Sequence, residues 1–257
     1  MGLQLKDISL SYKENLVLSN INIEFDVGEV IGLVGRNGSG KTSLINIMNG
    51  LVRPTSGLVL YNGKDINNIS IKERAKFISV VPQRINFPAD YKVLDLVYMG
   101  RNPHMDFFHR ATKEDLNNTY EVMKTTNIVG LAHKLISEIS GGEMQRVAIA
   151  MALNQRAPVL LLDEPTTNLD LVHEVLVLEL VKKLNSYPKS CVILSIHDLT
   201  LASKYCDKVV MLKNGELFAK GNPKDVFSKE NIESVFSTKV RVNKDPIDNS
   251  TLITPEV

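Results

Sequence analysis

The stretch Gly35-Arg36-Asn37-Gly38-Ser39-Gly40-Lys41-Thr42 matches the pattern G-x-x-x-x-G-K-[ST] of a phosphate-binding loop. Its small residues let successive backbone N–H groups turn inward around a phosphate, which larger side chains would obstruct. The helix expected after it points its positive N-terminal end at the same anion. Lys41 then reaches the β- and γ-phosphates, and Thr42 offers its hydroxyl to Mg²⁺. The alternative is a glycine-rich turn that contains Lys-Thr by chance.

The surroundings of this stretch favour phosphate binding. It follows an apolar run at 30–34 and opens a helical pattern whose apolar face extends from Leu44 to Leu51. Two further apolar runs, at 159–162 and 191–196, are also continuous rather than alternating, as in parallel strands that are covered on both faces. We therefore predict that the chain binds ATP with Mg²⁺ through Gly35, Asn37, Gly38, Ser39, Gly40, Lys41, Thr42 and Ser43.

The rest of the chain shows three other patterns. Up to Tyr61, apolar and polar residues alternate between turn signals, which predicts antiparallel strands joined to the parallel core. Residues 84–139 have no clear buried strand but several helical stretches, and residues 222–257 carry three prolines and form a short appendage. We predict a single α/β domain of the P-loop NTPase class. Residues 1–83 and 140–221 supply a mainly parallel core sheet with an antiparallel β subdomain, and 84–139 is an inserted helical subdomain.

The composition is that of an ordinary globular protein. Of the 257 residues, 44% are hydrophobic and 23% charged, and a formal net charge of +1 gives no general attraction to nucleic acid. The N-terminus lacks the pattern of a secretory signal, and no apolar stretch approaches the roughly 20 residues that span a bilayer. We therefore expect a soluble chain that meets a membrane only through partners. Cys191 and Cys206 read as buried free thiols.

Two adjacent acids, Asp163 and Glu164, follow the apolar run at 159–162, and Pro165 forces the chain out of the strand. In open α/β sheets the ligand crevice lies at the carboxyl ends of the strands, where the phosphate loop also lies. Asp163 is placed to hold Mg²⁺, and Glu164 is placed to orient and deprotonate the attacking water. The alternative for both is a solvated acidic strand terminus.

A histidine, His197, directly follows the run at 191–196 and so occupies a third strand end. A lone histidine is more often structural, but an imidazole at this edge is placed to contact the γ-phosphate and the catalytic water. The remaining histidines show no convincing metal-ligand spacing and are interpreted as ordinary loop and surface residues: His104, His109, His133 and His173.

A second candidate phosphate contact begins at Ser140. Locally, Ser140 and Glu143 form a capping box at the start of a long helix. Between them, Gly141 and Gly142 leave the helix N-terminus bare, so it can approach a phosphate closely. Because one chain needs only one cradle, this second site becomes useful if it covers the nucleotide of a partner copy. We therefore predict a homodimer.

In order and separation, these motifs resemble the nucleotide-binding subunits of ABC transporters over essentially the whole chain. The resemblance is carried by Gly35–Thr42, Gln83, Ile139-Ser140-Gly141-Gly142-Glu143-Met144-Gln145-Arg146, Leu162-Asp163-Glu164-Pro165, Asn168-Leu169-Asp170 and His197.

The resemblance implies further roles. Tyr12 would stack on adenine, although an exposed strand tyrosine is the alternative. Gln83 would sense Mg²⁺ and the water, and would lead into the helical region that touches membrane partners. Ser140, Gly141 and Gly142 would close on the γ-phosphate of the opposite subunit, and residues 168–170 would cross the dimer interface.

Two departures from the family pattern are mild. Ile139 and Glu143 stand where the family usually has Leu and Gln, and the interface loop reads Asn168-Leu169-Asp170 rather than Ser-Ala-Leu-Asp. Every group with a direct chemical role remains.

The segments at 97–104 and 168–174 are similar to the ATP-binding subunits of iron–siderophore, haem and cobalamin importers.

This resemblance implies an ATPase that is peripheral on the cytoplasmic face of the cell membrane. ATP binding would close two copies together, and hydrolysis would separate them and move polytopic permease subunits that receive solute from an extracytoplasmic binding protein. The alternatives are a molybdate or tungstate importer, a soluble ABC-type ATPase with no membrane partner, and a nucleotide-regulated module without turnover. The intact Glu164 argues against the last of these.

Overall fold

The computed structural model describes residues 2–105, 112–184 and 190–256, and its core is a six-stranded sheet with the strand order β10-β9-β3-β8-β7-β6. Five strands run parallel, and β10 pairs antiparallel with β9 at one edge. The strands are β3 (Val30–Val34), β6 (Ile78–Val81), β7 (Val159–Leu162), β8 (Cys191–Ser195), β9 (Lys208–Lys213) and β10 (Glu216–Gly221). Every residue of β3, β7 and β8 is buried, as the continuous apolar runs predicted.

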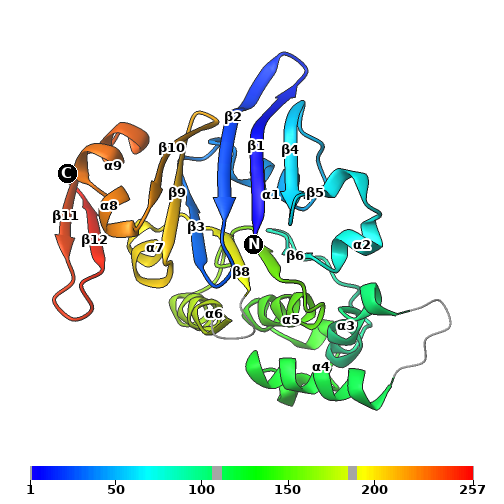
Figure 1. Cartoon of the computed structure of the whole chain (residues 1–257). Helices are drawn as coiled ribbons and strands as arrows, with labels where there is room; N and C mark the ends of the chain where they lie inside the picture. Colours follow the sequence, from blue (N-terminus) through cyan, green and yellow to red (C-terminus); the bar gives the residue numbers. More distant parts are fainter. Residues whose placement is uncertain (1, 106–111, 185–189, 257) are drawn as a thin grey trace.

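A second, four-stranded sheet confirms the antiparallel part of the prediction. Its order is β2-β1-β4-β5, from β1 (Leu3–Tyr12), β2 (Asn15–Phe25), β4 (Ser56–Tyr61) and β5 (Lys64–Asp65). Apolar residues from this sheet, from α1 (Lys41–Met48) and from the core sheet form one buried cluster. The packing therefore fixes α1, and with it the phosphate loop, between the two sheets (Figure 1).

The helix after the phosphate loop is shorter than its apolar pattern suggested. Helix α1 ends at Met48, and Gly50 takes a left-handed φ of 70°, which stops the helix. Leu51 therefore lies outside α1, and 73% of its surface is exposed, so the prediction that the apolar face of this helix extends to Leu51 was wrong.

A group of helices has its own apolar cluster, to which α3, α4 and α5 contribute. The elements before and within this region are η1 (Ile66–Asn68), α2 (Ile71–Ala75), α3 (Val93–Met99), η2 (Asn102–His104), α4 (Lys113–Thr125), η3 (Val129–Leu131), η4 (Ile136–Glu138) and α5 (Gly141–Asn154). Helix α5 also contributes Ala148, Ile149 and Ala152 to the cluster beneath the core sheet. It thus connects the helical region rigidly to the sheet.

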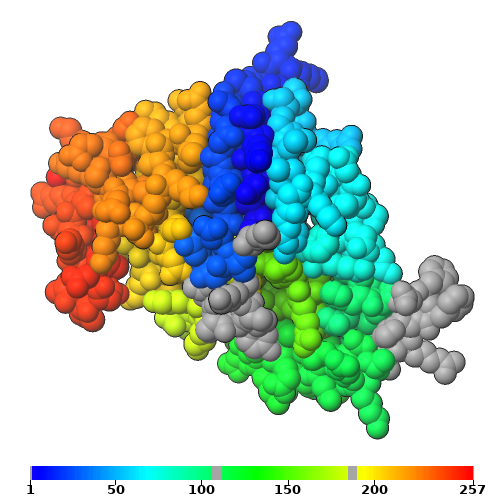
Figure 2. Space-filling model, viewed as in Figure 1, coloured from blue at the N-terminus to red at the C-terminus, as the bar shows by residue number. Residues whose placement is uncertain are grey.

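The C-terminal part begins beside α5 and ends at the edge of the molecule near β9 and β10. It contains α6 (Leu171–Leu184), α7 (Leu199–Tyr205), α8 (Pro223–Val226), α9 (Lys229–Phe236) and the hairpin of β11 (Val240–Lys244) and β12 (Thr251–Pro255). The Thr251 N–H donates to Ser203 Oγ of α7 at 2.7 Å, which fastens the hairpin. Figure 2 shows α8, α9 and the hairpin, in orange and red, on the side of the molecule away from the green helical region.

Both cysteines are buried free thiols, as predicted, and Cys206 directly follows α7. Burial raises the pKa of each thiol to about 12. Across the described ranges, every helix is too short or too polar to cross a bilayer.

Candidate active site

The phosphate loop joins β3 to α1 and depends on glycine at two points. Gly40 has φ 99° and immediately precedes α1, whose N-terminus carries no side-chain cap. A Cβ on Gly35 would lie 2.5 Å from Leu212 O and 2.6 Å from Ser39 Oγ, so no side chain fits there. The helix N-terminus is therefore left open to an anion, as phosphate binding requires.

The Lys41 ammonium lies over this loop. Its Nζ donates to Gly35 O at 2.8 Å and to Arg36 O at 3.2 Å. Burial lowers the pKa of Lys41, and the negative charges of Glu164 and Asp163 partly offset this, so the pKa stays below its usual value. Two neutral carbonyls compensate a buried ammonium only in part, and a phosphate would complete its neutralisation.

An oxygen-rich corner lies at the end of β7. The Asp163 carboxylate is buried and accepts from Ser195 Oγ at 2.8 Å and from Thr42 Oγ1 at 3.3 Å. A hydroxyl and a carboxylate at this separation suit a hard cation such as Mg²⁺, which takes few protein ligands beside phosphate oxygens. The described residues contain no cluster of three or more histidines, cysteines and acids that would hold a metal by themselves. The donor set therefore fits Mg²⁺ that arrives with a nucleotide.

The Glu164 carboxylate is held by three side chains. Gln83 Nε2 donates to Oε2 at 2.6 Å, Thr167 Oγ1 donates to Oε2 at 3.0 Å, and His197 Nε2 donates to Oε1 at 2.6 Å. Only 13% of the Glu164 side chain is exposed. Partial burial raises the pKa of Glu164, but the hydrogen bonds from these donors and the charge of His197 together outweigh it, so the pKa lies below its usual value.

The backbone of Glu164 is equally constrained. Its φ is 48°, a left-handed conformation that is uncommon outside glycine, and its N–H donates to Ser195 Oγ at 2.7 Å. Ser195 therefore bridges the two acids: its hydroxyl donates to Asp163 and accepts from Glu164. This turn points the two adjacent carboxylates in different directions. Asp163 lies beside Thr42, and Glu164 lies beside Gln83 and His197.

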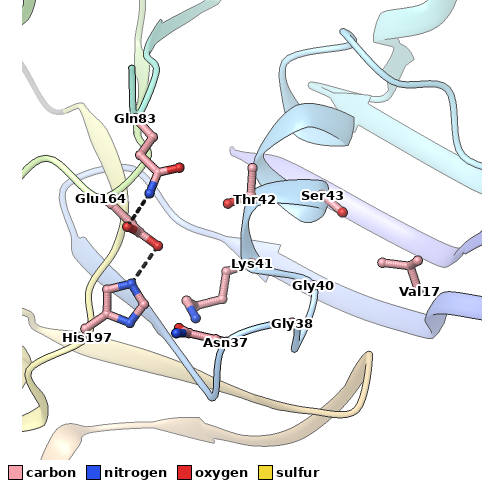
Figure 3. A pocket seen from close by; sticks show the side chains of 10 residues that line it. All are labelled: Val17, Asn37, Gly38, Gly40, Lys41, Thr42, Ser43, Gln83, Glu164 and His197. Atoms are coloured by element: carbon pink, nitrogen blue, oxygen red, sulfur yellow. Dashed lines mark hydrogen bonds and ion pairs between the residues drawn. The ribbon is translucent and has the colours of Figure 1, made fainter. Parts of the chain in front are cut away.

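These groups surround one open cavity of about 370 Å³. Figure 3 shows Glu164 between Gln83 and His197, on the side of the cavity opposite Ser43 and Val17. The structure thus brings together residues from five separate segments of the chain. The lining residues are Val17, Asn37, Gly38, Gly40, Lys41, Thr42, Ser43, Gln83, Glu164 and His197.

Other predicted site residues lie elsewhere. Gly35 and Ser39 are within the phosphate loop but do not line this cavity, and Tyr12 lies half-exposed at the end of β1. Ser140 caps α5 in the predicted capping box with Glu143, and the residues 140–142 do not line the cavity of their own chain.

Several residues that the sequence interpretation missed take part in the site. Ser195 sits in an apolar run, where its hydroxyl was the available signal, and Thr167 donates to Glu164 from the turn after β7. Val17 lines the cavity from β2. His173 is not an ordinary surface histidine, because its ring packs on Gly142. His104 and His133 remain peripheral, and His109 lies outside the described residues.

Comparisons with known proteins agree with this geometry. A family profile described as ABC transporter matches residues 18–167. The petrobactin import ATP-binding protein FpuC of Bacillus anthracis is 38% identical over 232 residues, which cover 90% of this chain and 85% of that protein. The cobalamin import ATP-binding protein BtuD of Halobacterium salinarum is 36% identical over 255 residues, but the chain spans only 64% of its length.

Solved structures show the same fold. A transporter described as metal-chelate type, in an inward-facing conformation, is 25% identical with a TM-score of 0.86, covering 100% of this chain and 98% of that one. The dimeric cassette MJ0796 with bound ADP and Pi is 28% identical with a TM-score of 0.75, over 86% of this chain and 98% of that one. The predicted fold class is confirmed. The chain therefore belongs to the ABC transporter family, as one of its ATP-binding chains.

Proposed function

We propose that this chain hydrolyses ATP with Mg²⁺ to power import across a membrane. One observation carries the proposal: the Glu164 carboxylate is held between Gln83 and His197 and faces the cavity that Lys41 and the phosphate loop also line. A carboxylate that is ionised, partly buried and fixed by donors is suited to accept a proton from an attacking water.

The chain's own residues divide the work. The phosphate-loop N–H groups and the Lys41 ammonium bind the β- and γ-phosphates, and Glu164 orients the water and takes its proton. His197 and Gln83 hold Glu164 in place, and both line the cavity where the γ-phosphate and the water lie. Thr42 and Asp163, with Gln83, would hold Mg²⁺, which supplies charge neutralisation to the phosphate oxygens when bound. In this proposal Tyr12 stacks on the adenine at the outer end of the cavity.

A second copy completes each site in this proposal. Ser140 and Gly141 are exposed at the N-terminus of α5 and do not line the cavity of their own chain, so they are available to a partner's γ-phosphate. The dimeric MJ0796 cassettes support this arrangement. Residues 168–170 then lie in the interface.

The proposed cargo is a metal chelate of the iron–siderophore, haem or cobalamin type. The support is that similar chains are named as petrobactin, enterobactin and cobalamin import ATP-binding proteins. The chain would then sit on the cytoplasmic face of the membrane beneath polytopic permease subunits, which receive cargo from an extracytoplasmic binding protein.

The proposed division of the chain follows the same functions. Residues 1–83 and 140–221 form the catalytic core, 84–139 the helical subdomain, and 222–257 the appendage.

One surface suits the permease. Leu51, Ile71 and Val80 are exposed apolar side chains that border a groove of about 290 Å³ between α1, α2 and β6. Ile71 is 77% exposed and Leu51 73%, and such side chains gathered on one groove are typical of an interaction site. Val80 lies three positions before Gln83. A membrane subunit that docks in this groove would therefore contact the strand that leads directly to a residue of the site. We assign this groove to an apolar segment of the permease.

Turnover of Mg-ATP by the purified chain tests the hydrolytic part. We expect Glu164→Gln to bind ATP normally but to lose turnover by about two to four orders of magnitude, because it removes the base. We expect Lys41→Ala to lose ATP affinity, measured by calorimetry. The matched control is Glu216→Gln, which makes the same change at an exposed strand carboxylate and should leave the rate unchanged. Near-normal turnover in Glu164→Gln would refute its role as the base.

Copurification from solubilised membranes tests the transport part. Recovery of a polytopic subunit with the wild-type chain, and its loss with Ile71→Lys, would support the assigned groove. Recovery of soluble proteins alone would favour a soluble ATPase. If a polytopic partner is recovered, uptake of a labelled siderophore and of labelled molybdate by cells with and without the chain would distinguish the two importer alternatives.

A further inference from the structure

The ring of His173 lies directly against the second residue of α5. A Cβ built on Gly142 would meet His173 Cδ2 at 2.3 Å and Cγ at 2.6 Å, so the ring occupies the place where a side chain would be. Gly142 is buried although its neighbours Ser140 and Gly141 are exposed. The His173 ring can therefore pack here only because residue 142 is glycine, although the two residues are 31 positions apart in the chain.

The other edge of the ring is held by Asp170. His173 Nδ1 lies 2.8 Å from Oδ1 and 2.9 Å from Oδ2, and the His173 backbone N–H donates to Oδ1 at 2.9 Å. Because a carboxylate only accepts, Nδ1 carries the shared proton. These bonds lower the pKa of Asp170, the backbone bond most and the ring bond next. The carboxylate thus fixes both the start of α6 and the orientation of the ring.

A freely solvated histidine would have neither constraint. His133, for comparison, is exposed in the loop after η3, and the described residues provide it with no hydrogen bond. His173 is only 32% exposed and is pinned on two sides, by a carboxylate on one segment and by a helix N-terminus on another. Such a ring transmits a displacement of either segment to the other, because close-packed contacts resist compression.

We propose that His173 is a positioning residue that joins the interface loop to the N-terminus of α5, so that the two surfaces facing a second copy move as one unit. This inference rests on the proposed function, in which residues 168–170 and the exposed Ser140 and Gly141 both meet the partner. It assigns His173 no contact with nucleotide. Its effect is on how well a chain covers the ATP of its partner, and not on how well a chain binds its own ATP.

The strength of dimerisation and the affinity for nucleotide can be measured separately. In a Glu164→Gln background, which prevents turnover, sedimentation velocity with Mg-ATP gives the dimer dissociation constant, and calorimetry gives nucleotide affinity. We expect His173→Ala to raise the dimer dissociation constant about tenfold, the scale of a lost hydrogen bond to a carboxylate, and to leave nucleotide affinity within about twofold. His133→Ala in the same background is the matched control and should change neither.

A double-mutant cycle tests the contact itself. We expect Gly142→Ala to weaken dimerisation when His173 is present, because the added methyl group meets the ring, and to add little when His173 is replaced by alanine. Equal damage in both backgrounds would overturn the inference, as would unchanged dimerisation in His173→Ala or an equal loss of nucleotide affinity. If the Glu164→Gln reference stays monomeric with ATP, the proposed completion of the site by a second copy fails, and this inference fails with it.

Discussion

Replacement of Ser195 by alanine is the sharpest single test of how the two acids are held. The hydroxyl is fully buried, donates to the Asp163 carboxylate at 2.8 Å and accepts from the Glu164 N–H at 2.7 Å. Alanine removes the oxygen and leaves both partners short of a hydrogen bond. The carboxylate keeps only the longer contact from Thr42, at 3.3 Å.

The expected loss follows from the two bonds. A hydrogen bond to a charged group contributes about 1.5–3 kcal/mol and a neutral one about 0.5–1.5 kcal/mol, so Ser195→Ala should lower the free energy of unfolding by about 2–4.5 kcal/mol. The turnover number should also fall, by about tenfold or more, because the left-handed turn at Glu164 loses its anchor and the carboxylate is displaced. Nucleotide affinity should change less, since the phosphate loop is untouched.

The matched control is Ser79→Ala. Ser79 is also a buried serine in a core strand, but its hydroxyl makes only a long bond of 3.4 Å to Val159 O, away from the site. Urea unfolding by circular dichroism gives the stability, because the chain contains no tryptophan for fluorescence. A Ser195→Ala protein with the stability and turnover of the Ser79→Ala protein would show that the bridge between the acids does not hold them.

Two further predictions concern stability. Asn154 is buried, and its Nδ2 donates to Val97 O and to Thr119 Oγ1, both at 2.9 Å, so Asn154→Ala should cost about 1–3 kcal/mol in urea unfolding while ATP affinity is retained; an unaffected midpoint would contradict this. Because the pKa of Glu164 is depressed in the folded state, its stabilising effect is present above the ordinary value of 4.5 and is lost as the pH falls below it. The loss of stability between neutral pH and about pH 4 should therefore be smaller in Glu164→Gln than in wild type, and equal losses would count against that depressed pKa.

Local patterns were enough to predict the parts of the site that lie at strand ends. The phosphate loop, Asp163, Glu164 and His197 each follow a continuous apolar run, and parallel strands bring such ends to one edge. The capping box at Ser140 was predictable for the same reason, since it involves residues three positions apart. The error at Leu51 was avoidable, because Gly50 is a helix-stop signal that the apolar periodicity obscured.

Long-range contacts were not predictable. Ser195 reads as an ordinary strand residue, and only the adjacency of β7 and β8 places its hydroxyl between the two acids. The ring of His173 meets Gly142 because α6 begins beside α5, and no spacing in the sequence expresses that contact. The strands β6 and β9 did not stand out, because a serine interrupts the four residues of β6 and a lysine lies at each end of β9.

In the proposed dimer, the phosphate cradle of one chain is covered by the α5 N-terminus of the other. Two variants, each defective in one half, test it when mixed. Lys41→Ala removes the ammonium that binds the β- and γ-phosphates, so the phosphate loop of that chain no longer holds ATP. Gly141→Asp places a negative charge where the partner's phosphate would sit, yet the fold tolerates it, because a Cβ on Gly141 meets nothing within 4 Å and an acid is favourable at a helix N-terminus.

A mixed dimer of these variants holds one complete site, formed by the cradle of the Gly141→Asp chain and the α5 N-terminus of the Lys41→Ala chain. The decisive measurement is the ATPase rate of the mixture compared with the rates of the separate variants. We predict that neither variant alone turns over ATP and that the mixture regains activity, most strongly at equal proportions. A mixture that never exceeds the sum of its components, at any protein concentration, would contradict the shared site.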